Sequence, residues 1–516
     1  MRALDWFATA CGCAAIGLAA MRWLRVAQRE HYLFGSVTVF AARWWRSTRL
    51  DLAILLLAVA AVVASAWFGP SGVVAAAIVV AYPAGLGLRG RTSRLKWTRR
   101  LTTVACSSTV LAGVVVVVVA VTLGLAAVVV AAASVALGLP ALIDCALWVL
   151  RPLEDRLAGR YVAEARSALE RFDPTIVAVT GSYGKTTTKG YVAHIVAAQI
   201  DVLASPASYN NRAGLARTVN EHLRPSVEVL VAEMGTYGPG EIAALCAWMT
   251  PTIAVITAVG PAHLERFKTL DRTLAAKAEI TERAAVTVLN VDDARLATLA
   301  DDLKRAGKHV MRVSGADPGV DVAVVGVPDG IELHVDQRRV GVAVTGDGRP
   351  SALSNVACAA AVALELGLSA EEILPRLVNL PVAPNRLQQY VAERGYLVLD
   401  DTFNSNPLGA RLALGRLDGG SAAGRRVLVT PGMVELGRTQ AVENAALGEA
   451  AAAVCTDVVF VARTNRRALM AGVTRAGCGT HVVTVDRLPE AVEWVKGALG
   501  PGDAVLYEND LPDHFP

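Results

Sequence analysis

The residue types best suited to chemistry are concentrated in one stretch, Thr180–Lys189, with the sequence TGSYGKTTTK. The apolar run Ile176–Val179 predicts a strand before it, and Tyr191–Ala198 has the apolar spacing of a helix after it. A strand, a glycine-containing turn and a helix start direct backbone N–H groups and the positive end of a helix dipole towards an anion. The stretch therefore predicts a phosphate-binding loop, with an ordinary glycine turn as the simpler alternative.

The side chains of this loop predict a nucleotide site. Lys185 is placed to reach the β- and γ-phosphates, and the Thr186 hydroxyl is placed to reach Mg²⁺. The spacing between the two glycines is two residues shorter than in the usual Walker A motif. The residues predicted to bind ATP in this loop are Gly181, Ser182, Tyr183, Gly184, Lys185, Thr186 and Thr187.

Length and composition limit the class of protein. The chain has 516 residues, enough for three or four domains, and 53% of them are hydrophobic, with the excess at the front. The net charge is only +4, and no basic run with interleaved aromatic residues follows the front section, so no nucleic-acid partner is expected. The eight cysteines are scattered without a C-x-x-C pair, which argues against a zinc site and a disulfide framework.

Residues 1–150 predict an α-helical transmembrane section of about five helices. The apolar runs that predict these spans are Phe7–Met21, Leu52–Phe68, Val73–Leu88 and Leu101–Ile143, the last long enough for two helices that turn near Gly124. The intervening segments near 22–49 and 89–100 are rich in arginine, whereas the turns at 69–72 and 122–124 carry no lysine or arginine. The positive-inside rule then predicts a multi-pass protein of the cell (inner, or cytoplasmic) membrane whose later domains are cytoplasmic.

Two features mark the end of the predicted transmembrane section. Asp144 lies near the end of the last predicted span, where an acid is either functional or simply at the membrane interface. Residues 151–172 have the apolar spacing of an amphipathic helix and predict a linker to the catalytic part.

Residues 173–385 predict a central α/β domain around the phosphate loop. The apolar strand Val227–Ala232 ends at Glu233, where an acid near a phosphate loop often holds Mg²⁺; the alternative is a surface carboxylate. The strand Thr252–Thr257 is followed closely by His263. Residues 320–345 alternate around a Pro-Asp-Gly turn and predict a hairpin, and Asn355–Gly367 predicts an alanine-rich helix.

Residues 386–516 predict a second α/β domain. Strand patterns at Tyr396–Asp400, Val427–Thr430, Val458–Ala462, Val482–Val485 and Ala504–Tyr507 alternate with helical patterns. This alternation predicts βαβ units and a parallel, Rossmann-like sheet, and no G-x-G-x-x-G dinucleotide motif is present. Asp400–Pro407 follows the first of these strands, where an acid pair is otherwise a common helix cap.

These segments together resemble the Mur ligase family, over about the last two thirds of the chain. The matching segments are Thr180–Thr188, Tyr209–Gly214, Ala232–Gly235, Val259–Glu265, Ala276–Ile280, Leu289–Asp293 and Asp400–Pro407. Within the family they are most similar to the type that adds D-Ala-D-Ala to a UDP-MurNAc-tripeptide. The resemblance implies an ATP-dependent amide-bond ligase with a P-loop central domain and a Rossmann-like C-terminal domain.

The resemblance also implies a role for each matched residue. Glu233 and His263 match magnesium ligands, beside Thr186, and either Asn210 or Asn211 matches an asparagine close to the phosphates. Lys277 matches a lysine that is carbamylated in many members; a plain helical lysine is the alternative. The remaining matches are Asn290 to the residue that contacts adenine, Arg386 to the interdomain arginine at the γ-phosphate, and Asp401 to an acid that contacts ATP. The residues expected to act in catalysis are Lys185, Lys277, His263 and Arg386.

Two departures from the family leave the substrates open. Predicted membrane helices stand where the D-Ala-D-Ala-adding type has its UDP-binding domain, and the segment Tyr507–Asp513 differs from that type. The expected partners are ATP, a carboxylate donor that is lipid-linked or a peptide, an amino acid or dipeptide, and the lipid bilayer. The alternatives are a ligase of the poly-γ-glutamate or folylpolyglutamate kind, a P-loop ATPase that drives transport, and an inactive scaffold.

Overall fold

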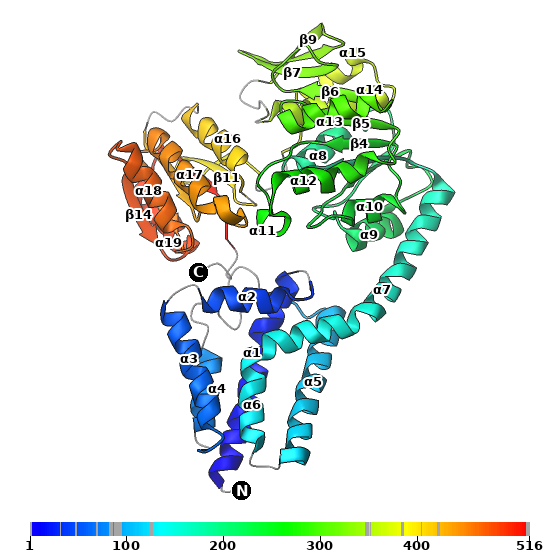
Figure 1. Ribbon diagram of the computed structural model, residues 1–516. Coiled ribbons are helices and arrows are strands. Elements are labelled where there is room, and N and C mark those ends of the chain that lie inside the picture. Colours follow the sequence, from blue (N-terminus) through cyan, green and yellow to red (C-terminus); the bar gives the residue numbers. More distant parts are fainter. Residues whose placement is uncertain are drawn as a thin grey trace. The chain divides into compact units, whose positions relative to one another are not determined.

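The computed structural model describes residues 3–30, 32–46, 49–68, 71–81, 86, 95–123, 127–345, 350, 352–382, 386–403, 405–419 and 424–511. The chain divides into two compact units. The helical unit comprises Met1–Leu157 with Leu511–Pro516, and the α/β unit comprises Ala158–Asp510. Figure 1 shows helices in the first unit and two sheets covered by helices in the second.

Seven helices belong wholly or partly to the helical unit as far as it is described. They are α1 (Ala3–Arg29), α2 (Ser36–Trp45), α3 (Arg49–Ala64), α4 (Ser71–Ala81), α5 (Arg99–Leu123), α6 (Val128–Leu137) and α7 (Leu139–Phe172). Trp23, Phe40, Val104 and Ile143 from four of these helices are buried in one apolar cluster. The unit therefore has a core of its own.

The prediction of five membrane spans is not confirmed. Among the described residues, only α5 is both long and apolar enough to cross a membrane, and the number rises to three if the bent pairs α2/α3 and α6/α7 each count as one span. The apolar run 101–143 does divide, as predicted, but it divides twice: α5 ends at Leu123 and a second break at Gly138 precedes α7, where Pro140 fits the first turn of a helix. The predicted turn at Gly124 and part of the span predicted at 73–88 lie outside the described residues.

Asp144 has a structural role in the helical unit. Its carboxylate accepts hydrogen bonds from the backbone N–H of Thr38 at 2.8 Å, from the Thr38 hydroxyl at 2.5 Å and from the N–H of Val37 at 3.4 Å. These groups lie in the first turn of α2, which has no capping side chain of its own. Asp144 of α7 therefore caps α2, because a carboxylate satisfies exposed N–H groups at a helix start.

The segment predicted as a linker is part of a longer helix. α7 runs without a break from Leu139 to Phe172, with Pro152 inside it. Val162, Ala165 and Leu169 from its last three turns are buried in the core of the α/β unit. The end of α7 is therefore part of the α/β fold.

The middle domain contains a nine-stranded sheet with the order β2-β3-β1-β4-β5-β6-β7-β8-β9. Its strands are β1 (Thr175–Thr180), β2 (Val202–Ala204), β3 (Val229–Glu233), β4 (Ile253–Ile256), β5 (Val286–Asn290), β6 (His309–Ser314), β7 (Val322–Val327), β8 (Gly330–Val335) and β9 (Arg338–Val344). The strands from β2 to β7 are parallel, and β7, β8 and β9 pair antiparallel. The predicted hairpin around residues 328–330 is confirmed.

Helices cover both faces of this sheet, as the buried apolar strands require. They are α8 (Lys185–Val196), α9 (Arg212–His222), α10 (Glu241–Cys246), α11 (Leu264–Phe267), α12 (Leu270–Ala278), α13 (Ala294–Arg305), α14 (Leu353–Glu365) and α15 (Ala370–Ile373), with short 3₁₀ turns at Glu279–Thr281 and Leu374–Leu377. One core joins α8 and α14 to the sheet, and a second joins α9, α10, α13 and the end of α7. The sheet thereby presents the carboxyl ends of β1, β3 and β4 at one edge.

The C-terminal domain contains a six-stranded sheet with the order β10-β11-β15-β12-β13-β14. Its elements are β10 (Gln388–Val391), β11 (Leu397–Asp401), α16 (Pro407–Asp418), β12 (Arg426–Thr430), a 3₁₀ turn (Gly437–Thr439), α17 (Gln440–Val454), β13 (Asp457–Val461), α18 (Arg466–Ala476), β14 (His481–Val485), α19 (Leu488–Ala498) and β15 (Ala504–Glu508). All pairs except β10/β11 are parallel, so the predicted Rossmann-like alternation is confirmed.

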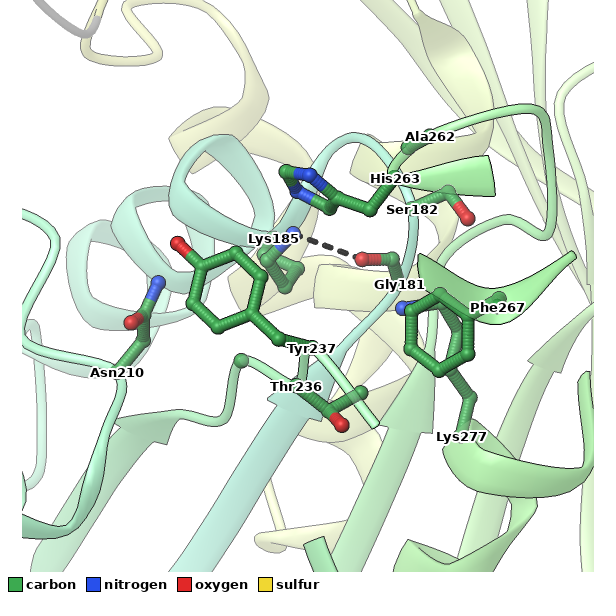
Figure 2. Close-up of a pocket in the computed structure, with 11 residues that line it drawn as sticks. Gly181, Ser182, Lys185, Asn210, Thr236, Tyr237, Ala262, His263, Phe267 and Lys277 are labelled. Atoms are coloured by element: carbon green, nitrogen blue, oxygen red, sulfur yellow. Dashed lines mark hydrogen bonds between the residues drawn. The ribbon is translucent and has the colours of Figure 1, made fainter. Parts of the chain in front are cut away.

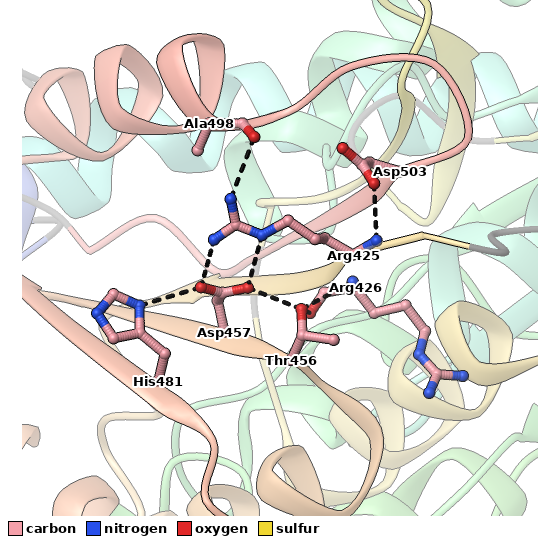
Figure 3. Close-up of polar contacts among 7 residues, drawn as sticks. All are labelled: Arg425, Arg426, Thr456, Asp457, His481, Ala498 and Asp503. Atoms are coloured by element: carbon pink, nitrogen blue, oxygen red, sulfur yellow. Dashed lines mark hydrogen bonds and ion pairs between the residues drawn. The ribbon is translucent and has the colours of Figure 1, made fainter.

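A polar network joins the amino ends of four strands of this sheet, β12, β13, β14 and β15 (Figure 3). The buried Asp457 carboxylate accepts two hydrogen bonds from the Arg425 guanidinium, at 2.6 and 3.1 Å, and one from Thr456 at 2.7 Å. His481 lies 3.0 Å from the same carboxylate, and the Arg425 N–H donates to Asp503. Burial raises the pKa of Asp457, but the hydrogen bonds from Arg425, Thr456 and His481 outweigh it and lower the pKa.

Candidate active site

The phosphate loop predicted from the sequence connects β1 to α8. Neither glycine of the loop has room for a side chain. A Cβ at Gly181 would lie 2.0 Å from the Thr257 hydroxyl, and one at Gly184 would lie 2.4 Å from the Asn355 amide oxygen. Gly184 also has a φ of +79° at the cap of α8, a conformation that favours glycine. Asn355 belongs to the predicted alanine-rich helix, and its side chain packs against the loop.

Glu233 lies at the carboxyl end of β3, beside the loop. The Thr186 hydroxyl donates to one carboxylate oxygen at 2.9 Å, and the Asn210 amide donates to the other at 3.1 Å. The side chain is almost fully buried. Burial alone would raise the pKa of Glu233, but Lys189, Lys185 and the two hydrogen bonds outweigh it and lower the pKa, so Glu233 is a carboxylate at neutral pH.

Lys189 is a site residue that the sequence analysis did not identify. It lies one turn after Lys185 on α8, is buried, and places its ammonium 3.2 Å from Glu233. The same ammonium donates to the backbone carbonyl of Ala207 at 2.6 Å, in the segment that leads to Asn210. The spacing of four residues between Lys185 and Lys189 could have indicated that both point to the same side of the helix.

Lys185 itself folds back on the loop. Its ammonium donates to the carbonyl of Gly181 at 2.7 Å. Burial and the nearby Arg386 lower the pKa of Lys185, while Glu233 opposes the shift. The Lys185 ammonium is therefore held where the backbone N–H groups of the loop point. There it can bind a phosphate oxygen in place of the Gly181 carbonyl.

One pocket collects six of the residues predicted from the sequence: Gly181, Ser182, Lys185, Asn210, His263 and Lys277 (Figure 2). It is lined by Gly181, Ser182, Lys185, Asn210, Gly235, Thr236, Tyr237, Ala262, His263, Phe267 and Lys277. Lys277 reaches it from α12 and is almost fully buried, and burial, together with Lys185, lowers the pKa of Lys277 well below its usual value. A lowered pKa favours the neutral amine, which is the form that reacts with CO₂, so the environment suits the carbamylation that the resemblance implies.

His263 enters the pocket from the segment after β4. Its ring packs edge-on against the Tyr237 ring, with centroids 5.0 Å apart. Its Nδ1 lies 2.5 Å from Glu435 of the C-terminal domain. Tyr237 was not predicted as a site residue, and Glu435 lies in a segment that follows a predicted strand.

Arg386 and Asp401 form the part of the site that the C-terminal domain supplies. The Arg386 guanidinium lies 4.4 Å from the centre of the Phe403 ring, and Glu233 and Asp401 are both close enough to stabilise its charge. Asp401 accepts a hydrogen bond from the N–H of Leu387 at 3.1 Å. Burial raises the pKa of Asp401 to about 6, against the opposing effects of that hydrogen bond and of Arg386.

The structure separates the two asparagines that the sequence left as alternatives. Asn210 contacts Glu233 and lines the pocket, whereas the Asn211 side chain caps α9 by accepting from Gly214 at 2.9 Å. Asn210 is therefore the residue near the phosphate loop, and Asn211 is a helix cap.

Seven predicted ATP-binding residues lie outside the pocket lining: Tyr183, Gly184, Thr186, Thr187, Asn290, Arg386 and Asp401. Asn290 is buried and donates to the carbonyl of Thr257 at 2.9 Å, so its amide links β5 to the segment after β4. The Tyr183 hydroxyl packs against Gly260, where an added Cβ would lie only 2.4 Å from it. Asp401 and Thr187 are likewise not among the lining residues. Their contact with nucleotide stays a prediction.

The oxygen donors at the loop fit Mg²⁺. The Thr186 hydroxyl and the Glu233 carboxylate adjoin each other, and Mg²⁺ in nucleotide sites commonly takes one or two protein oxygens together with phosphates and water. The described residues contain no group of three or more His, Cys, Asp or Glu side chains arranged to hold a metal by themselves. The site thus suits a metal that arrives with the nucleotide.

Comparison with known proteins agrees with this geometry. Residues 179–363 match the Mur ligase middle domain, and residues 385–507 match the Mur ligase, glutamate ligase domain. The UDP-N-acetylmuramoyl-tripeptide--D-alanyl-D-alanine ligase of Mycobacterium leprae is 33% identical over 64% of this chain and 70% of the relative.

Solved structures show the same fold. MurF from Acinetobacter baumannii is similar with a TM-score of 0.59 and 25% identity, over 68% of this chain and 77% of that one. MurF ligase from Thermotoga maritima in complex with ADP is similar with a TM-score of 0.56 and 25% identity, over 68% of this chain and 80% of that one. This chain belongs to the Mur ligase family, and it is an ATP-dependent, ADP-forming peptide ligase.

Proposed function

We propose that this protein is a membrane-anchored ligase of cell-wall peptide synthesis. It activates a peptide carboxylate, on a lipid-linked or a free carrier, and joins it to an amino acid or a dipeptide, with D-Ala-D-Ala as the first candidate. The observation that supports the chemistry is the convergence of Lys185, His263 and Lys277 on one pocket beside the Thr186–Glu233 pair. The observation that supports the substrate is the identity to D-alanyl-D-alanine ligases across both α/β domains.

In the first step a carboxylate oxygen of the donor attacks the γ-phosphorus of ATP, and the bond to the β-γ bridging oxygen breaks. The products are an acyl phosphate and ADP. Lys185 and Arg386 supply positive charge for the phosphoryl group, and backbone N–H groups of the loop hold the other phosphates. Thr186 and Glu233, with His263, would hold Mg²⁺, which neutralises phosphate charge when bound.

In the second step the incoming amine, after losing a proton, attacks the acyl carbon. The C–O bond to phosphate then breaks, phosphate leaves with the electron pair, and the amide nitrogen loses its second proton. Because an acyl phosphate is labile in water, a closed and partly buried pocket favours ligation over hydrolysis. The chain needs no covalent nucleophile for either step.

The anchoring part of the proposal is supported by the surface of α5. Val110, Val117 and Val121 on this helix are each at least 60% exposed, and only 17% of its apolar window is buried in the protein. Lipid is the environment that such a helix favours. We propose that the α/β unit lies on the cytoplasmic side, where ATP is available.

Fractionation and labelling test the anchoring. The protein should stay in the membrane pellet after an alkaline carbonate wash. A membrane-impermeant maleimide should label the exposed Cys478 of the C-terminal domain only after the cells are permeabilised, with the labelled site mapped by peptide mass spectrometry. Release by carbonate, or labelling of Cys478 in intact cells, would contradict the proposal.

The substrate is tested by mass spectrometry of the products. The purified full chain is given ATP, Mg²⁺, UDP-MurNAc-tripeptide and D-Ala-D-Ala, and the acid should gain the mass of the dipeptide minus water. Lys185→Ala should reduce the rate at least about 100-fold, since it removes a phosphate-binding charge. Lys304→Ala, an exposed lysine elsewhere in the middle domain, is the matched control and should retain full activity.

Other products would separate the parts of this proposal. Addition of glutamate residues, with no product from D-Ala-D-Ala, would replace the proposed substrate by that of a polyglutamate-type ligase. Retained ligation by Lys185→Ala would contradict the assignment of the pocket.

A further inference from the structure

The two domains of the α/β unit meet at a pair of side chains, His263 and Glu435, and the proposed chemistry does not use Glu435. His263 follows β4 of the middle domain, and Glu435 follows β12 of the C-terminal domain, 172 residues later. Nδ1 of His263 lies 2.5 Å from Oε2 of Glu435, and the N–H of Glu265 donates to the Glu435 carbonyl at 3.4 Å. The contact thus joins a pocket residue to the other domain.

Both residues of the pair have a strained backbone. The φ of His263 is +54° and that of Glu435 is +62°. Side chains other than glycine seldom adopt this left-handed region, at a cost of about 1 kcal/mol or more each, and such strain persists where the surroundings impose it. The fold therefore holds both side chains at this contact.

The loop that carries Glu435 is fixed by three buried asparagines. Asn444 accepts from the N–H of Met433 at 2.8 Å and donates to its carbonyl at 2.9 Å. Asn465 donates to the carbonyls of Pro431 and Met433, each at 3.0 Å, and Asn509 donates to the carbonyl of Gly432 at 2.7 Å. These hydrogen bonds pair backbone N–H and carbonyl groups of the loop with side chains of the C-terminal domain. They therefore hold the loop that carries Glu435 in one conformation.

The contact also determines which nitrogen of His263 carries the proton. A carboxylate only accepts, so Nδ1 is the nitrogen that donates to Glu435, and in the neutral ring the Nε2 lone pair is left for a ligand. His263 lines the pocket shown in Figure 2 with Lys185 and Lys277. A histidine whose second nitrogen donates to a carboxylate is the usual arrangement of a metal ligand.

We propose that Glu435 is a positioning residue that orients His263 towards Mg²⁺ from the opposite domain. The inference rests on the magnesium site of the proposed function. Its consequence is that contact between the two domains and metal ligation are coupled, because the carboxylate that orients the ligand belongs to the other domain. Full metal affinity then requires the C-terminal domain to be docked against the middle domain.

Metal binding, measured apart from catalysis, tests this. The full chain in lipid nanodiscs is titrated with Mn²⁺ in the presence of ADP, and free Mn²⁺ is followed by electron paramagnetic resonance. Glu435→Ala should weaken Mn²⁺ binding about tenfold, the usual effect of losing such a partner. Glu435→Gln keeps an acceptor oxygen for Nδ1 and should lose roughly threefold or less. Glu449→Ala, on the surface of the same domain, is the matched control and should bind as the parent does.

A double-mutant cycle separates positioning from a general effect. His263→Ala should weaken Mn²⁺ binding on its own, and adding Glu435→Ala should then change nothing further, because Glu435 acts through His263. Unchanged binding in Glu435→Ala, or the same loss in both backgrounds, would overturn the inference while leaving the magnesium site intact. Unchanged binding in His263→Ala would overturn the inference together with the proposed role of His263.

Discussion

The pKa values of acids at the two ends of the C-terminal sheet are shifted in opposite directions. At the amino end, Asp457 on β13 is held by a bidentate arginine, and these bonds lower the pKa of the carboxyl. At the carboxyl end, Asp401 and Glu508 are paired neighbours on β11 and β15. Burial raises the pKa of Asp401 to about 6 and that of Glu508 to about 8, with Asp401 adding to the second shift.

This difference separates a structural end from a functional one. Glu508 is fully buried and accepts hydrogen bonds from the neutral hydroxyls of Ser405 and Thr430. Leaving acids at this end without a bidentate cation costs stability, and perturbed acids of this kind are typical of ligand sites. The amino end has the arrangement expected where stability alone matters. In the middle sheet the candidate site acid, Glu233, also lies at the carboxyl end of its strand, but Lys189 and Lys185 lower its pKa.

The largest effect is expected at the amino end. Asp457→Ala removes the buried acceptor of two hydrogen bonds from Arg425 and of one from Thr456, and should lower the free energy of unfolding by about 3 kcal/mol. Chemical denaturation followed by tryptophan fluorescence measures it. kcat/KM below the unfolding transition should stay within twofold of the parent value. A stable but inactive variant would reverse the division between the two ends.

The next effect is expected at the carboxyl end, and on activity. Asp401→Asn keeps the acceptor for the Leu387 N–H but removes the charge beside Arg386, and should lower kcat/KM for ATP roughly 30-fold, or about 2 kcal/mol. Stability should change little. Asp418→Asn, an exposed acid at the end of α16, is the matched control. Steady-state kinetics of both variants within twofold of the parent would remove Asp401 from the nucleotide site.

Replacing Glu508 should have a smaller effect on the free energy of unfolding, and this effect should be an increase. An unfolded chain ionises this carboxyl above about pH 4.5, whereas the folded chain keeps its proton up to about pH 8. The folded state therefore binds more protons in this window, and stability falls as pH rises through it. Glu508→Gln should be more stable than the parent by about 1 to 2 kcal/mol at pH 9, after allowing for relaxation of the buried site, and by much less at pH 5.

Denaturation curves of both proteins at the two pH values measure this difference. A gain of equal size at pH 5 and pH 9 would show that Glu508 does not keep its proton in the folded chain. The lowered pKa of Asp457 acts in the other direction, since its stabilisation is present above the unfolded value near 4 and is lost in acid.

The sequence predicted those parts of the protein that depend on local pattern. The strand, glycine turn and helix start at Thr180–Lys189 were predicted because all the residues of a phosphate loop are consecutive in the sequence. The βαβ alternation after residue 386 was predicted because the spacing of apolar residues differs clearly between strands and helices. Glu233 could be identified because it ends a recognisable buried strand. In each case neighbours in the sequence determine the feature.

The features that the sequence did not predict depend on contacts between distant segments. Local pattern could not choose between Asn210 and Asn211, because the choice depends on which of them faces Glu233 and which caps α9. Glu435 meets His263 across two domains, and Asn355 packs on Gly184 from a distant helix. Asp144 looked like a functional or interfacial acid because its partner, the start of α2, lies 106 residues earlier.

The central claim, that this pocket forms an acyl phosphate from a carboxylate and ATP, is tested most directly by oxygen transfer. UDP-MurNAc-tripeptide labelled with ¹⁸O in its free carboxylate is turned over with ATP and D-Ala-D-Ala, and the released phosphate is analysed by mass spectrometry. One labelled oxygen should appear in each phosphate, because the carboxylate oxygen that attacks phosphorus leaves with it. Amide product accompanied by unlabelled phosphate would contradict the account.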